Sequence, residues 1–320
     1  MQTRALAALL CAWLPHAHAG DVELQSRADA WWTGPMLAPS PAMLPQGHAL
    51  IEPYLFDVIT TGTIDPQGAH HEAPRSQDIG SLTYMLYGLT ERVTVGLIPR
   101  FFYEASAAAP DSSGVVPGDL TLQAGYGLTQ YHEGSYLPAL ALVIDATVPT
   151  GRYQRLSRGS DGQGAGAYAT GISVYSQDYF WMPNGRILRT RLDLTYTRSS
   201  NVGLQDASVY GTPYGFRGSA RPGDGCTVDA AGEYSLTRNW VLALDLVYQY
   251  NFNTRVRGTI DPSAQPYATD SGSSYYVGFA PAVEYNWSAR GGVLLGVRVI
   301  GLGRNITTSV TPALAVNLVL

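Results

Sequence analysis

The sequence predicts an all-β fold, a transmembrane antiparallel β-barrel of about twelve strands with periplasmic N- and C-termini. Three observations predict it: long segments in which apolar and polar residues alternate, links that alternate between short and long, and a charged fraction of only 14% in 320 residues. Soluble domains carry about 25% charged residues. No run of about 18 apolar residues follows residue 20, which excludes helical membrane spans.

The N-terminal residues have the features of a secretory signal peptide. Arg4 precedes an apolar run over residues 5–14, and Ala17-His18-Ala19 is a small-residue cleavage site. We therefore expect three parts: a signal peptide at 1–19, a Pro-rich periplasmic or plug segment at 20–48, and an outer-membrane barrel at 49–320. After cleavage Cys226 is the one remaining cysteine, so no internal disulfide can form.

The segment from Trp240 is typical of a membrane-spanning strand. Leu242, Leu244 and Leu246 alternate with residues that include Asp245, over more residues than an ordinary soluble strand has. One greasy face and one polar face over ten or more residues indicate a strand around a polar lumen. Such segments occur at 49–60, 77–90, 92–105, 117–130, 138–149, 166–180, 186–199, 223–237, 239–254, 272–287, 291–303 and 307–320.

The links between these segments also follow the pattern of an outer-membrane barrel. Short links lie near Glu91, at 131–137, at 182–185, at Arg238 and at 288–290, whereas long links rich in Gly, Ser, Asp and Pro lie between them. Bacterial barrels have short periplasmic turns and longer outer loops. The count fits twelve strands if 304–306 is a short sixth loop. Trp181, Trp240 and Trp287 lie at the turn ends, as expected of an aromatic girdle.

Several motifs of the mature chain resemble a known family. They are Trp31-Trp32-Thr33-Gly34-Pro35, Leu44-Pro45-Gln46-Gly47-His48, Glu52-Pro53-Tyr54, Tyr87-Gly88-Leu89-Thr90-Glu91-Arg92, Gly118-Asp119-Leu120 and Val148-Pro149-Thr150-Gly151. Together they are similar to the outer-membrane transporter family named for the MetA pathway of phenol degradation. The resemblance implies a barrel that moves aromatic or other hydrophobic compounds. One departure is the last residue, Leu320, where such barrels usually end in Phe or Trp.

Charged and amide side chains within the strands are candidates for the lumen, because a charge at the lipid midplane costs about 2–4 kcal/mol. Counting from the turn ends predicts a mid-barrel constriction and a second level nearer the periplasm. One interpretation is that these groups only pair with one another and fill a narrow barrel. The other is a polar constriction that selects permeants. The constriction residues are Arg100, Gln123, Asp145, Asp193, Asp229, Asp245 and Arg298, and the second level is Arg189, Arg191, Glu233 and Glu284.

The Pro-rich segment is the second candidate. Its prolines prevent a regular helix or an inner strand, and its apolar side chains argue against a free tail. We expect it to dock at the periplasmic mouth or to enter the lumen as a plug; the alternative is a tail that only holds the barrel closed. The apolar residues that would form the plug are Trp31, Trp32, Met36, Leu37 and Leu44.

No catalytic constellation is predicted. The mature His residues lie in loops, in turns or before the first strand, so no Ser/His pair is expected on the barrel wall. We expect no enzyme activity, no cofactor and no metal, and the net charge of −5 argues against nucleic acid. His70 and His71 fit a solvated loop tip better than a metal site.

The sequence therefore predicts a channel or transporter in the outer membrane of a Gram-negative bacterium. Small molecules would pass passively through its lumen. The competing function is a non-conducting structural or surface-interaction barrel that acts through its extracellular loops, with residues 200–222 as the contact surface. The partners would be outer-membrane lipid, lipopolysaccharide, the barrel-assembly machinery and a small-molecule permeant.

Overall fold

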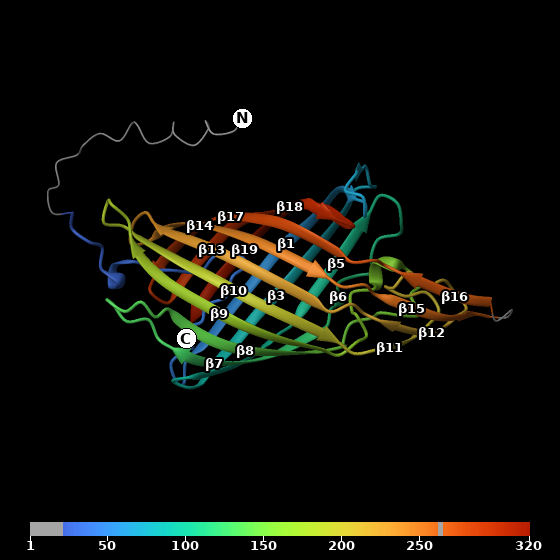
Figure 1. Cartoon of the computed structure of the whole chain (residues 1–320), viewed down its shortest axis with the longest axis horizontal. Helices are drawn as coiled ribbons and strands as arrows, with labels where there is room; N and C mark the ends of the chain where they lie inside the picture. The colour runs from blue at the N-terminus through green and yellow to red at the C-terminus, as the bar shows by residue number, and fades with distance from the viewer. Residues whose placement is uncertain (1–21, 262–264) are drawn as a thin grey trace, which may run out of the picture.

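The computed structural model describes residues 22–261 and 265–320, in which twelve spanning strands close into an antiparallel barrel (Figure 1). The predicted signal peptide lies outside these described residues. One spanning strand is interrupted and comprises β4 and β5. The spanning strands are β1 (Ala49–Ile64), β3 (Ser76–Thr90), β4 (Val93–Ile98) with β5 (Arg100–Ser106), β7 (Leu120–Thr129), β8 (Ala139–Val148), β9 (Ala169–Trp181), β10 (Ile187–Ser199), β13 (Gly225–Ser235), β14 (Trp240–Asn251), β17 (Ser274–Ser288), β18 (Gly291–Arg304) and β19 (Ile306–Val319).

The barrel closes between the first and last strands. β1 pairs with β3 on one side and with β19 on the other, and in the second pairing Leu55 lies opposite Leu314. The amide of Leu320 donates to the carbonyl of Ala49 over 2.8 Å. Because every edge of the spanning sheet is paired in this way, backbone groups at membrane depth are satisfied within the barrel.

The twelve-strand prediction is confirmed, and the strand borders differ from the predicted ones by a few residues. The largest difference is at the end of the first strand, predicted at 60 and observed at Ile64, because β1 continues through a register shift between Thr60 and Gly62. The third strand breaks at Pro99, which has no amide hydrogen to donate. The sixth loop is Asn305 alone, in a left-handed conformation with φ of 56°.

Alternation along each strand separates a lipid-facing surface from the lumen. In β14 the side chains of Leu242, Leu244 and Leu246 are exposed, whereas Val241 and Asp245 are fully buried. The exposed leucines form part of an apolar belt around the barrel, which therefore sits in a lipid bilayer. No helix in the described part of the chain is both long and apolar enough to cross a membrane.

A second sheet extends the barrel at the end that carries the long loops, which we call the loop end (Figure 1). Phe216 is fully buried there in an apolar cluster with Leu204 and Val256. This end also holds the short helix η2 (Gly159–Asp161), where the Ser113 amide donates to Asp161 over 2.7 Å and lowers the pKa of that carboxyl. The small strands at this end are β2 (His70–His71), β6 (Val116–Pro117), β11 (Val202–Gln205), β12 (Phe216–Arg221), β15 (Arg255–Ile260) and β16 (Gln265–Asp270).

The lipid-facing assignment predicts the effect of a charge at mid-strand. Leu246 is 52% exposed near the middle of β14. Leu246→Arg should lower the free energy of unfolding from lipid vesicles by about 2–4 kcal/mol, because the guanidinium would face hydrocarbon. Urea unfolding followed by tryptophan fluorescence measures this. As the control, Tyr214→Arg at an exposed loop position should leave stability unchanged; equal effects of both variants would contradict the assignment.

Candidate functional site in the barrel lumen

Three acidic side chains line one side of the lumen on the adjacent strands β10, β13 and β14. Asp193, Asp229 and Asp245 are all buried, and Asp193 lies directly opposite Asp229 in the strand pairing. Asp193 and Asp229 each keep a buried carboxyl oxygen without a hydrogen-bond partner among the described residues. This side of the lumen is therefore strongly acidic and only partly neutralised by the wall itself.

The other members of the predicted constriction lie on different parts of the wall. Gln123 donates to Asp145 over 3.0 Å between the neighbouring strands β7 and β8. Arg100 is on β5, which lies opposite β14 because six strand-to-strand steps separate them in either direction around the barrel. Arg298 is on β18. It lies two strands from β14 around the barrel, and neither arginine has an ion pair within residues 22–261 and 265–320.

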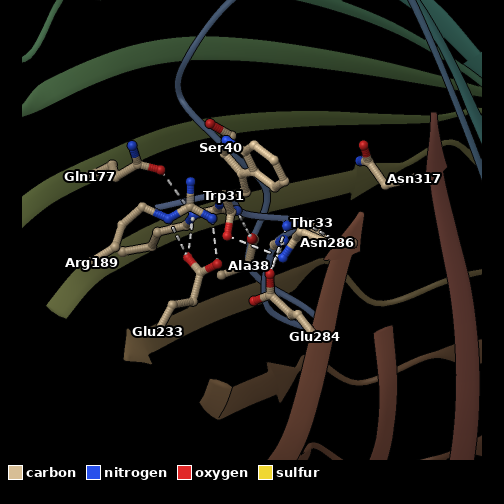
Figure 2. Close-up of polar contacts among 12 residues, drawn as sticks. Trp31, Thr33, Ala38, Ser40, Gln177, Arg189, Glu233, Glu284, Asn286 and Asn317 are labelled. Atoms are coloured by element: carbon tan, nitrogen blue, oxygen red, sulfur yellow. Dashed lines mark hydrogen bonds and ion pairs between the residues drawn. The ribbon is translucent and has the colours of Figure 1, made fainter. Parts of the chain in front are cut away.

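The predicted second level forms a buried ion-pair network on β10, β13 and β17 (Figure 2). Arg189 binds both carboxylate oxygens of Glu233, with its Nε 2.6 Å from Oε2. Arg191 lies 3.5 Å from the same carboxylate and donates to Gln177 over 3.1 Å. Two guanidinium groups thus share one carboxylate, and each has further N–H donors for an acceptor nearby.

The N-terminal segment enters the barrel at the end that carries the short links, the turn end. Beyond the short helix η1 (Arg27–Asp29), the Trp31 amide donates to the Arg238 carbonyl over 3.0 Å. Earlier in the segment, the Gln25 amide donates to the Gly185 carbonyl and Trp181 Nε1 donates to the Gln25 carbonyl, each over 2.9 Å. These contacts attach the segment to two separate turns of the barrel.

Two carboxylates of the wall receive backbone amides of the segment. Glu284 on β17 accepts from Thr33 N over 2.6 Å and from Gly34 N over 3.2 Å (Figure 2). Asp245 on β14 accepts from the amides of Met36, Leu37 and Ala38 at distances of 3.0, 3.2 and 3.0 Å. Five consecutive non-proline amides of the segment are therefore bound by two buried acids, and the segment lies against the acidic side of the lumen.

The sequence of the segment explains why its amides are free for these contacts. Pro35 and Pro39 prevent the regular helix or ladder that would otherwise use the amides between them. The segment also provides an acceptor to the wall, since Arg191 Nη1 donates to the Ala38 carbonyl over 2.6 Å. One of the two guanidinium groups beside Glu233 thus also binds the segment.

Small wall residues make room for the apolar side chains of the segment. Met36 is buried, and a Cβ added at Gly296 would lie 3.1 Å from its sulfur. This surface was not predicted from the sequence, although Ala recurs at inward positions of several strands and could have indicated it. The wall residues that form one cluster with Met36 are Ala243, Ala280, Ala282, Leu294, Ala313 and Ala315.

The five apolar residues predicted for a plug lie at different depths. Trp31 is at the turn end, where the Arg238 guanidinium is 5.2 Å from its ring centroid. The Arg189 guanidinium stacks 4.5 Å from the Trp32 ring. Met36 and Leu37 lie within the lumen against Asp245, and the Leu44 amide donates to Thr94 Oγ1 on β4 over 2.9 Å. The segment thus crosses the barrel interior from β14 and β17 to β4.

Two cavities remain between the segment and the wall formed by β1, β3 and β19. The larger, about 250 Å³, is lined by Trp32, Glu52 and residues of the segment. The smaller, about 160 Å³, is lined by Phe56, Arg298 and Thr311, and both are lined by Met36, Leu37, Tyr54 and Tyr84. The larger cavity therefore extends round the wall as far as Arg189 and Arg191 on β10, whereas the smaller one stays beside β1, β3, β18 and β19.

Aromatic rings of β1, β3 and β5 gather on one part of the lumen wall, and they were not predicted from the sequence. Tyr54 and Tyr84 meet edge to face with centroids 6.0 Å apart, as do Phe56 and Phe102 at 6.3 Å. In β1 both parities carry apolar residues, so periodicity alone could not identify which side chains face inward. The arrangement can bind or pass small apolar molecules. In the described ranges no group of three or more His, Cys, Asp or Glu side chains could hold a metal ion.

The extracellular contact surface expected as the alternative is partly internal. Phe216 is fully buried in the loop-end sheet, and the Tyr210 hydroxyl donates to the Ala165 carbonyl over 2.7 Å. Tyr214, in contrast, is 86% exposed. Residues 200–222 therefore build the loop end more than they offer a contact surface.

Comparisons with known proteins agree with this architecture. The family described as "Putative MetA-pathway of phenol degradation" matches residues 72–309. An outer membrane channel of Pseudomonas putida F1 is similar in structure, with a TM-score of 0.67 and 17% identity over 89% of this chain and 100% of that one. The β domain of a Bordetella autotransporter, BrkA, has a TM-score of 0.48 and 11% identity over 85% and 99% of the two chains.

A monoaromatic hydrocarbon channel, the TodX deltaS2S3 mutant, has a TM-score of 0.47 and 10% identity over 93% of this chain and 97% of that one. No curated protein matches the sequence significantly. The fold is therefore the one found in an outer membrane channel.

The contacts of Asp245 predict what holds the segment in place. Asp245→Asn removes the charge that three amides share, and hydrogen bonds to charged groups contribute about 1.5–3 kcal/mol each. In a Cys226→Ser background, Ala38→Cys places a single thiol on the segment. This thiol should react with a maleimide about tenfold faster when Asp245→Asn is added than when Asp245 is kept. The matched control is Asp229→Asn, which touches no residue of the segment; a similar acceleration in both variants would contradict the assignment.

Proposed function

The chain belongs to the family described as "Putative MetA-pathway of phenol degradation", and we propose that it is an outer-membrane channel for the passive passage of small hydrophobic or aromatic molecules. The observation that carries the proposal is the pair of cavities between the N-terminal segment and β1, β3 and β19. Tyr54 and Tyr84 line both cavities and Phe56 lines the smaller one, and such surfaces bind one-ring compounds by burial and edge-to-face contact.

The charges of the lumen support a selective passage. Asp193, Asp229 and Asp245 lie on one side of the barrel, whereas Arg100 lies on the strand opposite Asp245. Charges of opposite sign across a narrow opening create a transverse field that discriminates permeants by dipole and size. This arrangement favours the constriction interpretation over mere mutual neutralisation, because Arg100 and Arg298 have no ion pair among the described residues.

The Pro-rich segment would act as the plug of this channel. Its amides are bound by Glu284 and Asp245, and its side chains cover the alanine-rich part of the wall. The plug then narrows the lumen to the aromatic side and decides the size of what can pass. The alternative of a tail that only holds the barrel closed does not require residues 33–38 to lie inside the lumen.

The remaining features follow from a channel in the outer membrane. Residues 1–19 would direct export, 20–48 would form the plug, and 49–320 would form the barrel, with both termini periplasmic. The barrel-assembly machinery would insert the chain, and lipopolysaccharide would surround its loop end. We propose transport without a chemical reaction, in keeping with a family member whose fold is that of an outer membrane channel.

Solute uptake by liposomes tests the proposal. Vesicles that contain the refolded protein should take up phenol-type aromatics faster than protein-free vesicles, because the cavities provide an aromatic path, while sugars should show little excess. Protein-free vesicles set the baseline, since aromatics also cross bare lipid.

A variant that fills the smaller cavity tests whether the molecules pass through it. Ala313 lines the smaller cavity and is buried, so Ala313→Phe should strongly lower the excess uptake. Folding is checked by the heat-dependent shift of the barrel in electrophoresis. No excess uptake of any solute by folded protein would overturn the proposal and favour the structural or surface-interaction function.

A further inference from the structure

The smaller cavity combines an apolar lining with two polar groups that the protein does not use. Phe56, Tyr54 and Leu82 contribute one side, and Met36 of the segment contributes another. Arg298 on β18 and Thr311 on β19 also line it, and the two residues lie directly opposite each other in the strand pairing. The cavity therefore has an apolar part and a polar end.

The two polar groups at this end have no hydrogen-bond partner among the described residues. Arg298 Nε and Thr311 Oγ1 are both buried, and Thr311 is 2% exposed. Buried polar groups are almost always paired, because an unpaired one costs about 1–3 kcal/mol. Arg189 and Arg191, in contrast, both lie beside Glu233. The guanidinium of Arg298 and the hydroxyl of Thr311, on neighbouring strands, can therefore both donate to a ligand.

The size of the cavity limits the ligand to about one ring. Its volume is about 160 Å³, and an apolar cavity of about 150 Å³ is known to bind benzene. Tyr54 and Tyr84 stand edge to face beside it, an arrangement that offers both ring faces and ring edges to a third aromatic ring.

We propose that this cavity is a binding subsite for a one-ring aromatic carboxylate. The ring packs against Phe56 and Tyr54, and the carboxylate accepts hydrogen bonds from Arg298 and the Thr311 hydroxyl. Charge-assisted bonds from a guanidinium are the strong ones, and a carboxylate supplies the two oxygens that these two donors require. The inference rests on the proposed passage of aromatic molecules, and it specifies that the molecule bound here also carries an acidic group.

Equilibrium dialysis of radiolabelled benzoate against the purified protein in detergent tests the subsite. Benzoate should bind saturably. Benzamide, which keeps the ring but lacks the charge, and acetate, which keeps the charge but lacks the ring, should each compete about tenfold less well than unlabelled benzoate.

Variants identify the groups responsible. Arg298→Gln and Thr311→Val should each weaken benzoate binding, the first by about tenfold or more, because the anion loses its charged donor. The matched control is Arg304→Gln, an exposed arginine on the same strand outside the cavity, which should bind benzoate as the unaltered protein does.

Three results would overturn the subsite: no saturable binding, equal competition by benzamide and benzoate, or unchanged binding in folded Arg298→Gln. If Arg298→Gln fails to fold, Thr311→Val and the benzamide comparison on the unaltered protein decide. Uptake by liposomes is measured in parallel. Binding that depends on Arg298 without any uptake leaves the subsite and overturns the passage, whereas uptake that ignores Arg298 overturns the subsite alone.

Discussion

The arrangement of the lumen depends on the carboxylate of Asp245. It is fully buried in the wall of β14 and is satisfied by the amides of Met36, Leu37 and Ala38. A buried charge without partners costs several kcal/mol, so the barrel wall and the N-terminal segment stabilise each other. Glu284, on the neighbouring strand β17, accepts hydrogen bonds from the amides of Thr33 and Gly34 in the same way.

This constraint divides the lumen into two halves with different chemistry. The segment covers the acidic half, where its own backbone supplies the donors. Both cavities reach β1, β3 and β19 and are lined by the rings of Tyr54 and Tyr84, and the smaller one is lined by Arg298 of β18 as well. Cavities with an aromatic lining therefore remain beside a strongly charged wall, with the segment between them and Asp245.

Much of the fold could be predicted from the sequence, and less of the site. Period-two alternation in segments such as β14 is strong because a charge such as Asp245 is tolerated on one face alone. The inward side chains of β1 could not be recognised, since Leu50, Ile51, Tyr54 and Leu55 make both of its faces apolar. Their direction follows from pairing with β19 at the barrel closure, a contact between the two ends of the chain. The amide partners of Asp245 likewise depend on the path of a proline-rich segment that has no periodicity.

Hydrogen–deuterium exchange of the segment, followed by mass spectrometry of the protein in detergent, tests the central claim most directly. The amides of Met36, Leu37 and Ala38 are bound to a buried carboxylate inside the lumen. We expect them to exchange about a hundredfold or more slowly than amides of exposed loop residues such as Ala109, because exchange requires the segment to leave Asp245. Exchange of these three amides as fast as that of the loop would contradict the account.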